Sequence, residues 1–117
     1  MKVLKFGGTS VGSADRMKEV AALVNDGDRK IVVLSAMSGT TNNLVEIANY
    51  LYKKNHDGAN EIVSQMEKKY YEEVEALYAT DKYKELGREL IRLHFDEIKG
   101  YTRDVFTVYE EKSILAQ

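Results

Sequence analysis

A glycine-rich segment near the N-terminus is the first part of the chain whose residue types and spacing suit a chemical task. It reads Gly-Gly-Thr-Ser-Val-Gly-Ser over residues 7–13 and follows Lys5. Paired glycines let backbone N–H groups approach an anion closely, and Thr9 and Ser10 add hydroxyl donors. A helix starting after the segment adds its positive N-terminal end. The residues therefore suit the binding of a phosphate group.

The spacing of the glycines excludes the best-known nucleotide-binding patterns. No glycine stands two residues after Gly7, so the dinucleotide fingerprint is absent. Gly7 and Gly12 have the spacing of a P-loop, but Ser13 replaces the lysine that the P-loop carries after its second glycine. Two interpretations stay open for this segment, a tight turn between a strand and a helix and a phosphate site that uses Lys5.

A second segment rich in neutral donors follows at residues 35–42. Its side chains that can donate hydrogen bonds are Ser35, Ser38, Thr40, Thr41 and Asn42. None of them is a base or an activated nucleophile without a histidine nearby, so the segment suits binding rather than proton transfer. The alternative is that one of the last three residues only caps a helix.

Strand and helix patterns place the two segments in space. Residues 2–6 form a β-compatible run, and apolar residues at helical spacing follow up to residue 24, with Ser13 as N-cap. The helix is expected to end at residues 25–27. Residues 31–34 are apolar at every position, which predicts a buried strand. In a right-handed β-α-β unit both strands end at the same sheet edge, so both segments should open into one crevice.

Helical periodicity dominates the rest of the chain. A helix is predicted around Leu44 to Leu51, with Asn43 and Glu46 at capping-box spacing. Two long helices follow from residue 59, separated by a turn at residues 80–81 with Asp81 as cap. The first has the apolar stripe Val63, Met66, Tyr70, Val74 and Leu77, and the second has the stripe Leu86, Leu90, Leu93, Tyr101, Val105 and Val108.

Several features of the long helices have a structural interpretation. Gly87 and Gly100 are expected to kink or end the second helix. The charges of residues 68–69 and 72–73 predict a solvated face with i,i+4 pairs, Lys68 with Glu72 and Lys69 with Glu73. The tyrosines are expected in the core and at interfaces.

Two parallel strands are too few for an ordinary parallel sheet. Either later strands lie beyond Gln117, or another chain completes the sheet, so a homo-oligomer is expected. The unpaired sheet edges and the apolar stripes also predict self-association.

Composition limits the function classes. The chain has 117 residues with 17 basic and 19 acidic side chains, which gives no excess charge to recruit nucleic acid. Its longest apolar runs are five residues, such as residues 20–24, so neither a membrane span nor a signal segment is expected. No cysteine is present, which removes thiol catalysis and disulfides. A cytoplasmic protein is the default expectation.

The two segments together resemble the beginning of the aspartokinases, a branch of the amino-acid kinase family. The matching stretches are Lys-Phe-Gly-Gly-Thr-Ser-Val at residues 5–11 and Leu-Ser-Ala-Met-Ser-Gly-Thr-Thr-Asn-Asn-Leu at residues 34–44. The end of the chain, residues 113–117, resembles the approach to the Gly-Glu substrate motif of that family. The resemblance implies an N-terminal fragment, with the remaining kinase strands, regulatory ACT domains and in some relatives a homoserine dehydrogenase beyond it.

The implied fold class is α/β. Residues 1–54 would be the β-α-β-α start of the amino-acid kinase three-layer sandwich with parallel strands, and residues 55–117 a long helical hairpin subdomain. The implied reaction is transfer of the ATP γ-phosphoryl group, with Mg²⁺, to the side-chain carboxylate of L-aspartate. The product, 4-phospho-L-aspartate, enters lysine, threonine and methionine biosynthesis.

The resemblance also implies roles for individual residues. Lys5 would contact the transferring phosphoryl group, and Ser35 and Thr41 would face the aspartate. The residues lining the phosphates would be Gly7, Gly8, Thr9 and Ser10. No protein ligand of a metal ion is identified, so Mg²⁺ would be held by the nucleotide phosphates and by groups outside this chain.

Three alternatives remain. The first is another amino-acid kinase with a different acceptor, the second is a non-catalytic module that binds an anion, and the third is a helical interaction protein in which the β-α-β-α part is a scaffold. The last two predict that the parent protein forms no aspartyl phosphate. Competition between substrates distinguishes the first alternative from an aspartate kinase.

Overall fold

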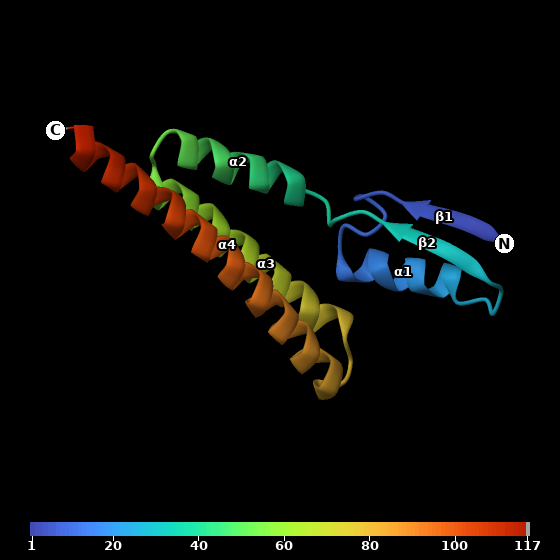
Figure 1. The fold of residues 1–117 in the computed structure, drawn as a ribbon. Helices are drawn as coiled ribbons and strands as arrows, with labels where there is room; N and C mark the ends of the chain where they lie inside the picture. The colour runs from blue at the N-terminus through green and yellow to red at the C-terminus, as the bar shows by residue number, and fades with distance from the viewer. Residues whose placement is uncertain (117) are drawn as a thin grey trace.

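The computed structural model describes the backbone of residues 1–116 and the side chains of residues 1–105. Within this range two strands and four helices follow one another (Figure 1). They are β1 (Lys2–Phe6), α1 (Ala14–Val24), β2 (Lys30–Leu34), α2 (Thr40–Tyr52), α3 (His56–Leu77) and α4 (Asp81–Ala116). This is the predicted order of elements. The side chains of Val108 and of residues 113–117 lie outside the described residues.

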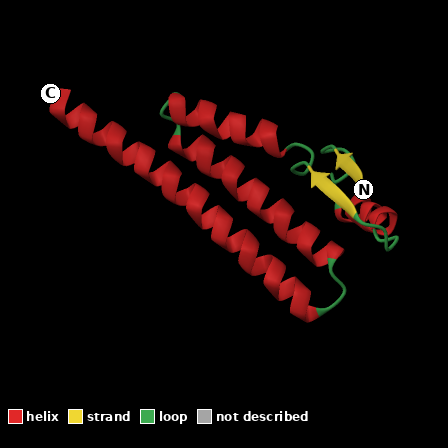
Figure 2. Cartoon of the chain, turned by 45° about the vertical axis from the view of Figure 1, so that its right-hand side comes forward, coloured by secondary structure: helices red, strands yellow, loops and turns green. Residues whose placement is uncertain are grey.

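The molecule is elongated, with principal extents of 65 × 31 × 18 Å. The strands and α1 gather at one end, whereas α3 and α4 run side by side in opposite directions along most of the length (Figure 2). α2 starts close to the end of β2, runs away from the strands and packs on α3, which turns back beside it (Figure 1). No described helix has the length and apolarity needed to cross a membrane.

The two strands pair in parallel, with Lys2 opposite Lys30 and Phe6 opposite Leu34. α1 runs along one face of the pair, where its Leu23 lines a hollow together with Leu4 and Phe6. Since neighbouring residues of a strand point to opposite faces, Val3 and Lys5 belong to the other face.

The prediction of a buried second strand is wrong for the described part of the chain. Ile31, Val33 and Leu34 are 48%, 44% and 58% exposed. The reason is that within residues 1–116 the sheet has two strands, and α1 runs along one of its faces. The three-layer sandwich therefore stays a prediction.

The ends of α1 agree with the sequence. The Ser13 side chain accepts a hydrogen bond from the backbone N–H of Arg16, and Asn25 is the C-cap. A turn containing Gly27, whose φ of 83° lies in the left-handed region, then leads to β2.

The start of α2 differs from the expectation. Its N-cap is Gly39, with φ 86° and no side-chain capping bond. Thr40 is already the first helical residue, so the predicted caps Thr40, Thr41 and Asn42 and the capping box at Asn43 are wrong. A left-handed backbone conformation at this position favours glycine, and the helix begins at the next residue.

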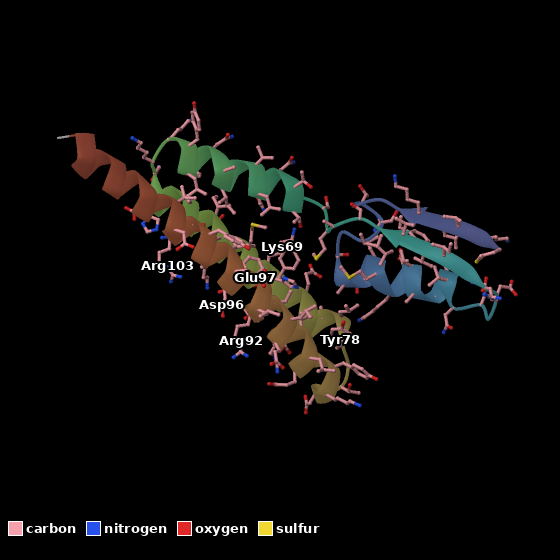
Figure 3. The ribbon with its side chains drawn as sticks, in the orientation of Figure 1. Lys69, Tyr78, Arg92, Asp96, Glu97 and Arg103 are labelled. Carbon is pink, nitrogen blue, oxygen red and sulfur yellow. The ribbon has the colours of Figure 1, made fainter. Side chains whose placement is uncertain are left out.

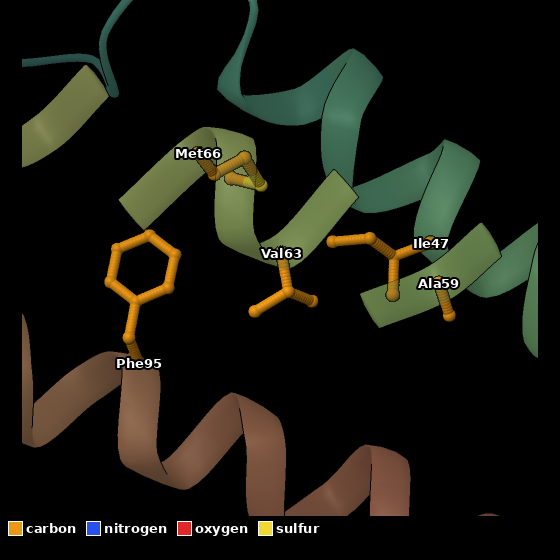
Figure 4. Close-up of a cluster of buried hydrophobic side chains, with 5 residues drawn as sticks. All are labelled: Ile47, Ala59, Val63, Met66 and Phe95. Atoms are coloured by element: carbon orange, nitrogen blue, oxygen red, sulfur yellow. The ribbon is translucent and has the colours of Figure 1, made fainter. Parts of the chain in front are cut away.

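The main core lies among α2, α3 and α4. It consists of the buried side chains Ile47, Ala59, Val63, Met66 and Phe95 (Figure 4). The predicted stripe of α3 is confirmed, since Val63, Met66 and Val74 are buried and Tyr70 and Leu77 half-buried. The contacts at this interface carry the apolar burial that stabilises the fold.

The described part of the predicted stripe of α4 lies mostly on an exposed face of that helix, with Val105 half-buried. Leu86, Leu90, Leu93 and Tyr101 are all more than half exposed, whereas Phe95 is buried against α3. Asp81 is the first residue of α4 rather than its cap.

The helix α4 continues through both of its glycines, so the expectation that they end it is wrong. A Cβ at Gly87 would lie 2.9 Å from Cγ1 of Val74 and 3.1 Å from Cε2 of Tyr78. The glycine therefore permits the close approach of α4 to α3.

Candidate functional site

The glycine-rich segment after β1 is a tightly folded loop. The Gly7 carbonyl accepts hydrogen bonds from the N–H groups of Ser10 (3.1 Å) and Val11 (3.3 Å), and Gly12 N–H donates to the Thr9 carbonyl (3.3 Å). Val11 is buried and anchors the loop. We call residues 7–12 the first loop.

The segment after β2 is held at both ends. Ser35 N–H donates to the Phe6 carbonyl (3.0 Å), which extends the strand pairing by one residue. Met37 is buried, and its carbonyl accepts a hydrogen bond from Thr40 N–H (3.1 Å). We call residues 35–39 the second loop.

The two loops lie against each other, as the β-α-β topology predicts. A Cβ at Gly8 would lie 3.2 Å from the Ala36 carbonyl oxygen and 3.7 Å from Ser35 Oγ. A Cβ at Gly12 would lie 3.2 Å from Cβ of Ser38. Larger residues at these two positions would push the loops apart, which gives the glycines a packing reason beyond turn formation.

The predicted site residues divide into those that the structure brings together and those that it leaves separate. Gly8 and Ser35 are neighbours across the loops. Thr41 is exposed in the first turn of α2. Lys5 is exposed on the sheet face opposite α1, and no hydrogen bond or ion pair of its side chain occurs among the described residues.

The other predicted phosphate-lining residues occupy the first loop itself. Gly7 and Thr9 are exposed, and Ser10 is half-buried. A Cβ at Gly7 would meet no atom within 4 Å, so the space beside this residue is open.

The N-terminal end of α1 is already occupied by a carboxylate of the chain. Ala14 N–H donates to Glu73 Oε2 of α3 at 2.6 Å, and Arg16 N–H donates to Ser13 Oγ at 3.3 Å. The favourable position for an anion at this helix end is thus taken by Glu73. The expectation that α1 offers this end to a phosphate is not met in the described structure, and the loop amides and hydroxyls remain as donors.

Sequence reasoning missed the residues of α3 that contact the second loop and the start of α2. Lys69 Nζ donates to the Ser38 carbonyl at 3.3 Å, and the Tyr70 hydroxyl bonds to Thr40 Oγ1. The expected i,i+4 ion pairs of residues 68–73 are not found among the described ion pairs. No local signal distinguishes these side chains, because their partners lie about thirty or more residues away in sequence.

The charged groups with shifted pKa values lie away from the loops. The Arg88 guanidinium hydrogen-bonds the Glu75 carboxylate and lowers its pKa, and the Glu67 carboxylate raises the pKa of Lys99. No group of three or more His, Cys, Asp or Glu side chains suited to a metal occurs among the described residues. The loops therefore form a surface of neutral donors, suited to binding anions.

Comparison with known proteins places this arrangement in a family. The sequence profile of the Amino acid kinase family matches residues 1–104. The chain belongs to the amino acid kinase family. This assignment agrees with the α/β architecture of two parallel strands and four helices in the described range.

Aspartokinases are among the relatives with the greatest similarity. The aspartate kinase of Pseudomonas putida is 56% identical over 50 residues, which cover 39% of this chain and 12% of the relative. The aspartokinase of Pseudomonas aeruginosa is 48% identical over 56 residues, 44% of this chain and 14% of the relative. Aspartokinase 2 of Arabidopsis thaliana, described as chloroplastic, is 56% identical over 46 residues, 38% of this chain and 8% of the relative. The matched segment is thus a small part of each of these amino acid kinases.

Proposed function

We propose that this chain is the N-terminal part of an aspartate kinase. The enzyme would transfer the γ-phosphoryl group of ATP to the side-chain carboxylate of L-aspartate and release ADP. The product, 4-phospho-L-aspartate, would be the first intermediate of lysine, threonine and methionine biosynthesis. The names of the relatives support the choice of aspartate within the family.

The observation that carries the proposal is the contact between the two loops. Gly8 lies against Ser35 and Ala36, so donors from the first loop and from the second loop border one region of the surface. A kinase must hold a phosphate and its acceptor side by side, and adjacent loops of neutral donors meet that requirement. We assign the first loop to the phosphates and the second to aspartate.

The residue types fit the chemistry of a carboxylate acceptor. An aspartate side chain with a pKa of about 3.9 is ionised at neutral pH, so the nucleophile needs no general base. The barrier lies in bringing a carboxylate against a polyanion. One opposite charge at about 4 Å offsets on the order of 4 kcal/mol of that repulsion at an effective dielectric constant of 20.

Lys5 is the cation of this chain that we assign to that role. It lies near the end of β1, two residues before the first loop, and its side chain is exposed to a ligand. Thr9 and Ser10 would donate to phosphate oxygens, and Ser35 and Thr41 to the aspartate. Mg²⁺ would neutralise part of the phosphate charge, held by the nucleotide and by groups outside this chain, since the described residues offer no ligand cluster.

The substitution Lys5→Ala tests the proposal in the full-length gene product. We expect kcat to fall at least about 100-fold, the scale of losing one preorganised contact to the transition state. Trapping of the acyl phosphate with hydroxylamine measures the rate. Lys2→Ala, at the far end of the same strand, is the matched control and should keep the parent rate. A Lys5→Ala enzyme within threefold of the parent would remove Lys5 from catalysis, and a parent without aspartate-dependent hydroxamate would refute the function.

We further propose that the protein is cytoplasmic and that the 117-residue chain alone is inactive and self-associates. The exposed apolar side chains of β2 and of α4 support self-association, because water contact with them is unfavourable. Sedimentation at micromolar concentration measures it, and a compact monomer would refute it.

A further inference from the structure

The middle of α3 contains three doubled residues. Residues 68–73 read Lys-Lys-Tyr-Tyr-Glu-Glu. With 3.6 residues per turn, Lys69, Tyr70 and Glu73 fall within about 100° of the helix circumference, and the other member of each pair lies on the opposite side. The doublets therefore place the same three residue types on two different faces of one helix.

One face contacts the second loop and the start of α2. Lys69 Nζ donates to the Ser38 carbonyl at 3.3 Å, and the Tyr70 hydroxyl bonds to Thr40 Oγ1. Figure 3 shows Lys69 projecting from α3 toward the region between α2 and the strands, whereas Arg92 projects from α4 on the side away from the strands. Two successive residues of α3 thus hold the segment in which Gly39 starts α2.

The same face contacts the helix that follows the first loop. Glu73 Oε2 accepts the Ala14 N–H at 2.6 Å, and Ala14 is buried. One turn further along α3, the Ala76 carbonyl accepts a hydrogen bond from Lys18 Nζ at 2.8 Å. The carboxylate also complements the positive end of α1, which strengthens the attachment.

Among the described residues, no hydrogen bond or ion pair joins the opposite face to either loop. Lys68, Tyr71 and Glu72 line a surface hollow together with Glu67 and Glu75, which also belong to α3. The two faces are therefore a natural comparison, in which residue type is matched and position differs.

α3 itself is well fixed, so it can serve as a support. The Tyr70 ring packs on the Phe95 ring of α4, with centroids 5.7 Å apart, and Val63 and Met66 on α3 are buried. Lys99 of α4 bonds the Glu67 carboxylate at 2.9 and 3.1 Å. Because α3 is held in this way, it can keep the groups that are hydrogen-bonded to it in fixed positions.

We propose that Lys69, Tyr70 and Glu73 are positioning residues that fix the first and second loops relative to each other. The proposal rests on the proposed function, in which one loop binds phosphate and the other the acceptor. Because a displacement of about 1 Å between reacting groups can cost on the order of 100-fold in rate, such fixing matters for phosphoryl transfer. The helices after residue 55 thus take part in the site without touching a substrate.

Kinetics of the full-length gene product test the proposal. Tyr70→Phe removes the hydroxyl bond to Thr40 and keeps the ring on Phe95. We expect the KM for aspartate to rise about tenfold, the scale of one lost hydrogen bond, with the KM for ATP within twofold. Tyr71→Phe, the matched control, should leave both values within twofold.

Substitution of Glu73 should give the reverse pattern of KM changes. Glu73→Ala should raise the KM for ATP about tenfold and change that for aspartate less, because its partner Ala14 follows the first loop. Glu73→Gln keeps an acceptor for the Ala14 N–H and should recover most of the loss. Glu72→Ala is the matched control.

A second measurement does not depend on activity. Amide hydrogen exchange should become faster at residues 39–43 in Tyr70→Phe and at residues 14–17 in Glu73→Ala, and unchanged in both controls. Equal effects of the two members of each doublet, or unchanged exchange at both segments, would overturn the positioning role. A parent enzyme without aspartate kinase activity would refute the proposed function, while faster exchange in these variants would still support the positioning contacts.

Discussion

The strand pair and the pair formed by α3 and α4 differ in how they bury apolar side chains. In β2, Ile31 and Val33 are apolar and more than 40% exposed. In α3 and α4, Val63 is 1% and Phe95 4% exposed, and both belong to the main core. The loops assigned to binding are attached to the strands, which are the less buried region. Their position therefore depends on contacts with the better packed helices, and this is the role we give to α3.

Substituting Phe95 should destabilise the packed helix pair most. Phe95→Ala removes a side chain that packs on Met66 and Tyr70, and we expect the free energy of unfolding to fall by about 3–5 kcal/mol. Urea denaturation followed by circular dichroism measures the loss. If α3 supports the loops, the variant should also expose the Ala14 amide to exchange.

The matched control for this prediction is Leu93→Ala on the same helix. Leu93 is 55% exposed, so its loss should change the free energy of unfolding by about 0.5 kcal/mol or less. A Leu93 variant as unstable as the Phe95 variant would mean that the other face of α4 is the packed one.

The same pair of residues shows what the sequence could predict. Apolar runs and glycines were sufficient to predict the order of strands and helices, because each pattern is local. α4, however, carries two apolar faces at helical spacing, one with Leu86, Leu90 and Leu93 and one with Ile91 and Phe95. Periodicity does not distinguish them, because the choice depends on how α3 approaches, which Gly87 permits.

Prediction of the site had a similar limit. The first and second loops stand out by residue type, and the topology brings them together as expected. The contact of Lys69 with the second loop and that of Glu73 with the start of α1 were not predictable, since they join residues far apart in sequence and their types also suit a solvated helix face. The start of α2 was mispredicted because Gly39 replaces the usual side-chain cap with a left-handed backbone.

Substituting the glycines of α4 sharpens the account of helix packing. An alanine Cβ at Gly87 would lie 2.9 Å from Cγ1 of the buried Val74, so Gly87→Ala should destabilise the fold by about 1–2 kcal/mol, net of the gain in helix propensity. At Gly100 the only described atom within 4 Å of an added Cβ, apart from the neighbouring residues and the backbone of the same helix, is Nη2 of Arg103, at 3.8 Å. Gly100→Ala should therefore stabilise by up to about 1 kcal/mol. Melting curves measure both, and the same sign for the two variants would contradict the packing.

The substitution Thr41→Val tests the residues beside the strands that are assigned to binding aspartate. We expect the KM for aspartate in the full-length gene product to rise about tenfold and that for ATP to change less, because the hydroxyl is assigned to the acceptor. Since Gly39 is the N-cap of α2 and no side chain caps it, the free energy of unfolding should stay within about 0.5 kcal/mol. A lower melting temperature with an unchanged KM would give the Thr41 hydroxyl a purely structural role.

The smallest expected effect concerns the rim of the α3 and α4 pair. Glu75 accepts a hydrogen bond from Arg88 Nε at 2.7 Å and lies 3.5 Å from Lys84 Nζ, and these contacts, that of Arg88 above all, lower the Glu75 pKa from its usual 4.5. A carboxyl group whose pKa is lower in the folded state stabilises the fold above its unfolded pKa, and this contribution is lost as the pH falls through the folded value. The stability difference between the parent and Glu75→Gln should thus be greatest near neutral pH and disappear on acidification below the usual value. Because the groups are exposed, high salt should reduce the stability difference as well.

Melting temperatures of the parent and Glu75→Gln from neutral pH down to about pH 3 measure the difference. The Glu72→Gln variant, on the face of α3 with no hydrogen bond to either loop among the described residues, serves as control. A difference that stays constant over this range would show that the charge of Glu75 does not hold α3 to α4, and that apolar packing alone joins the two helices.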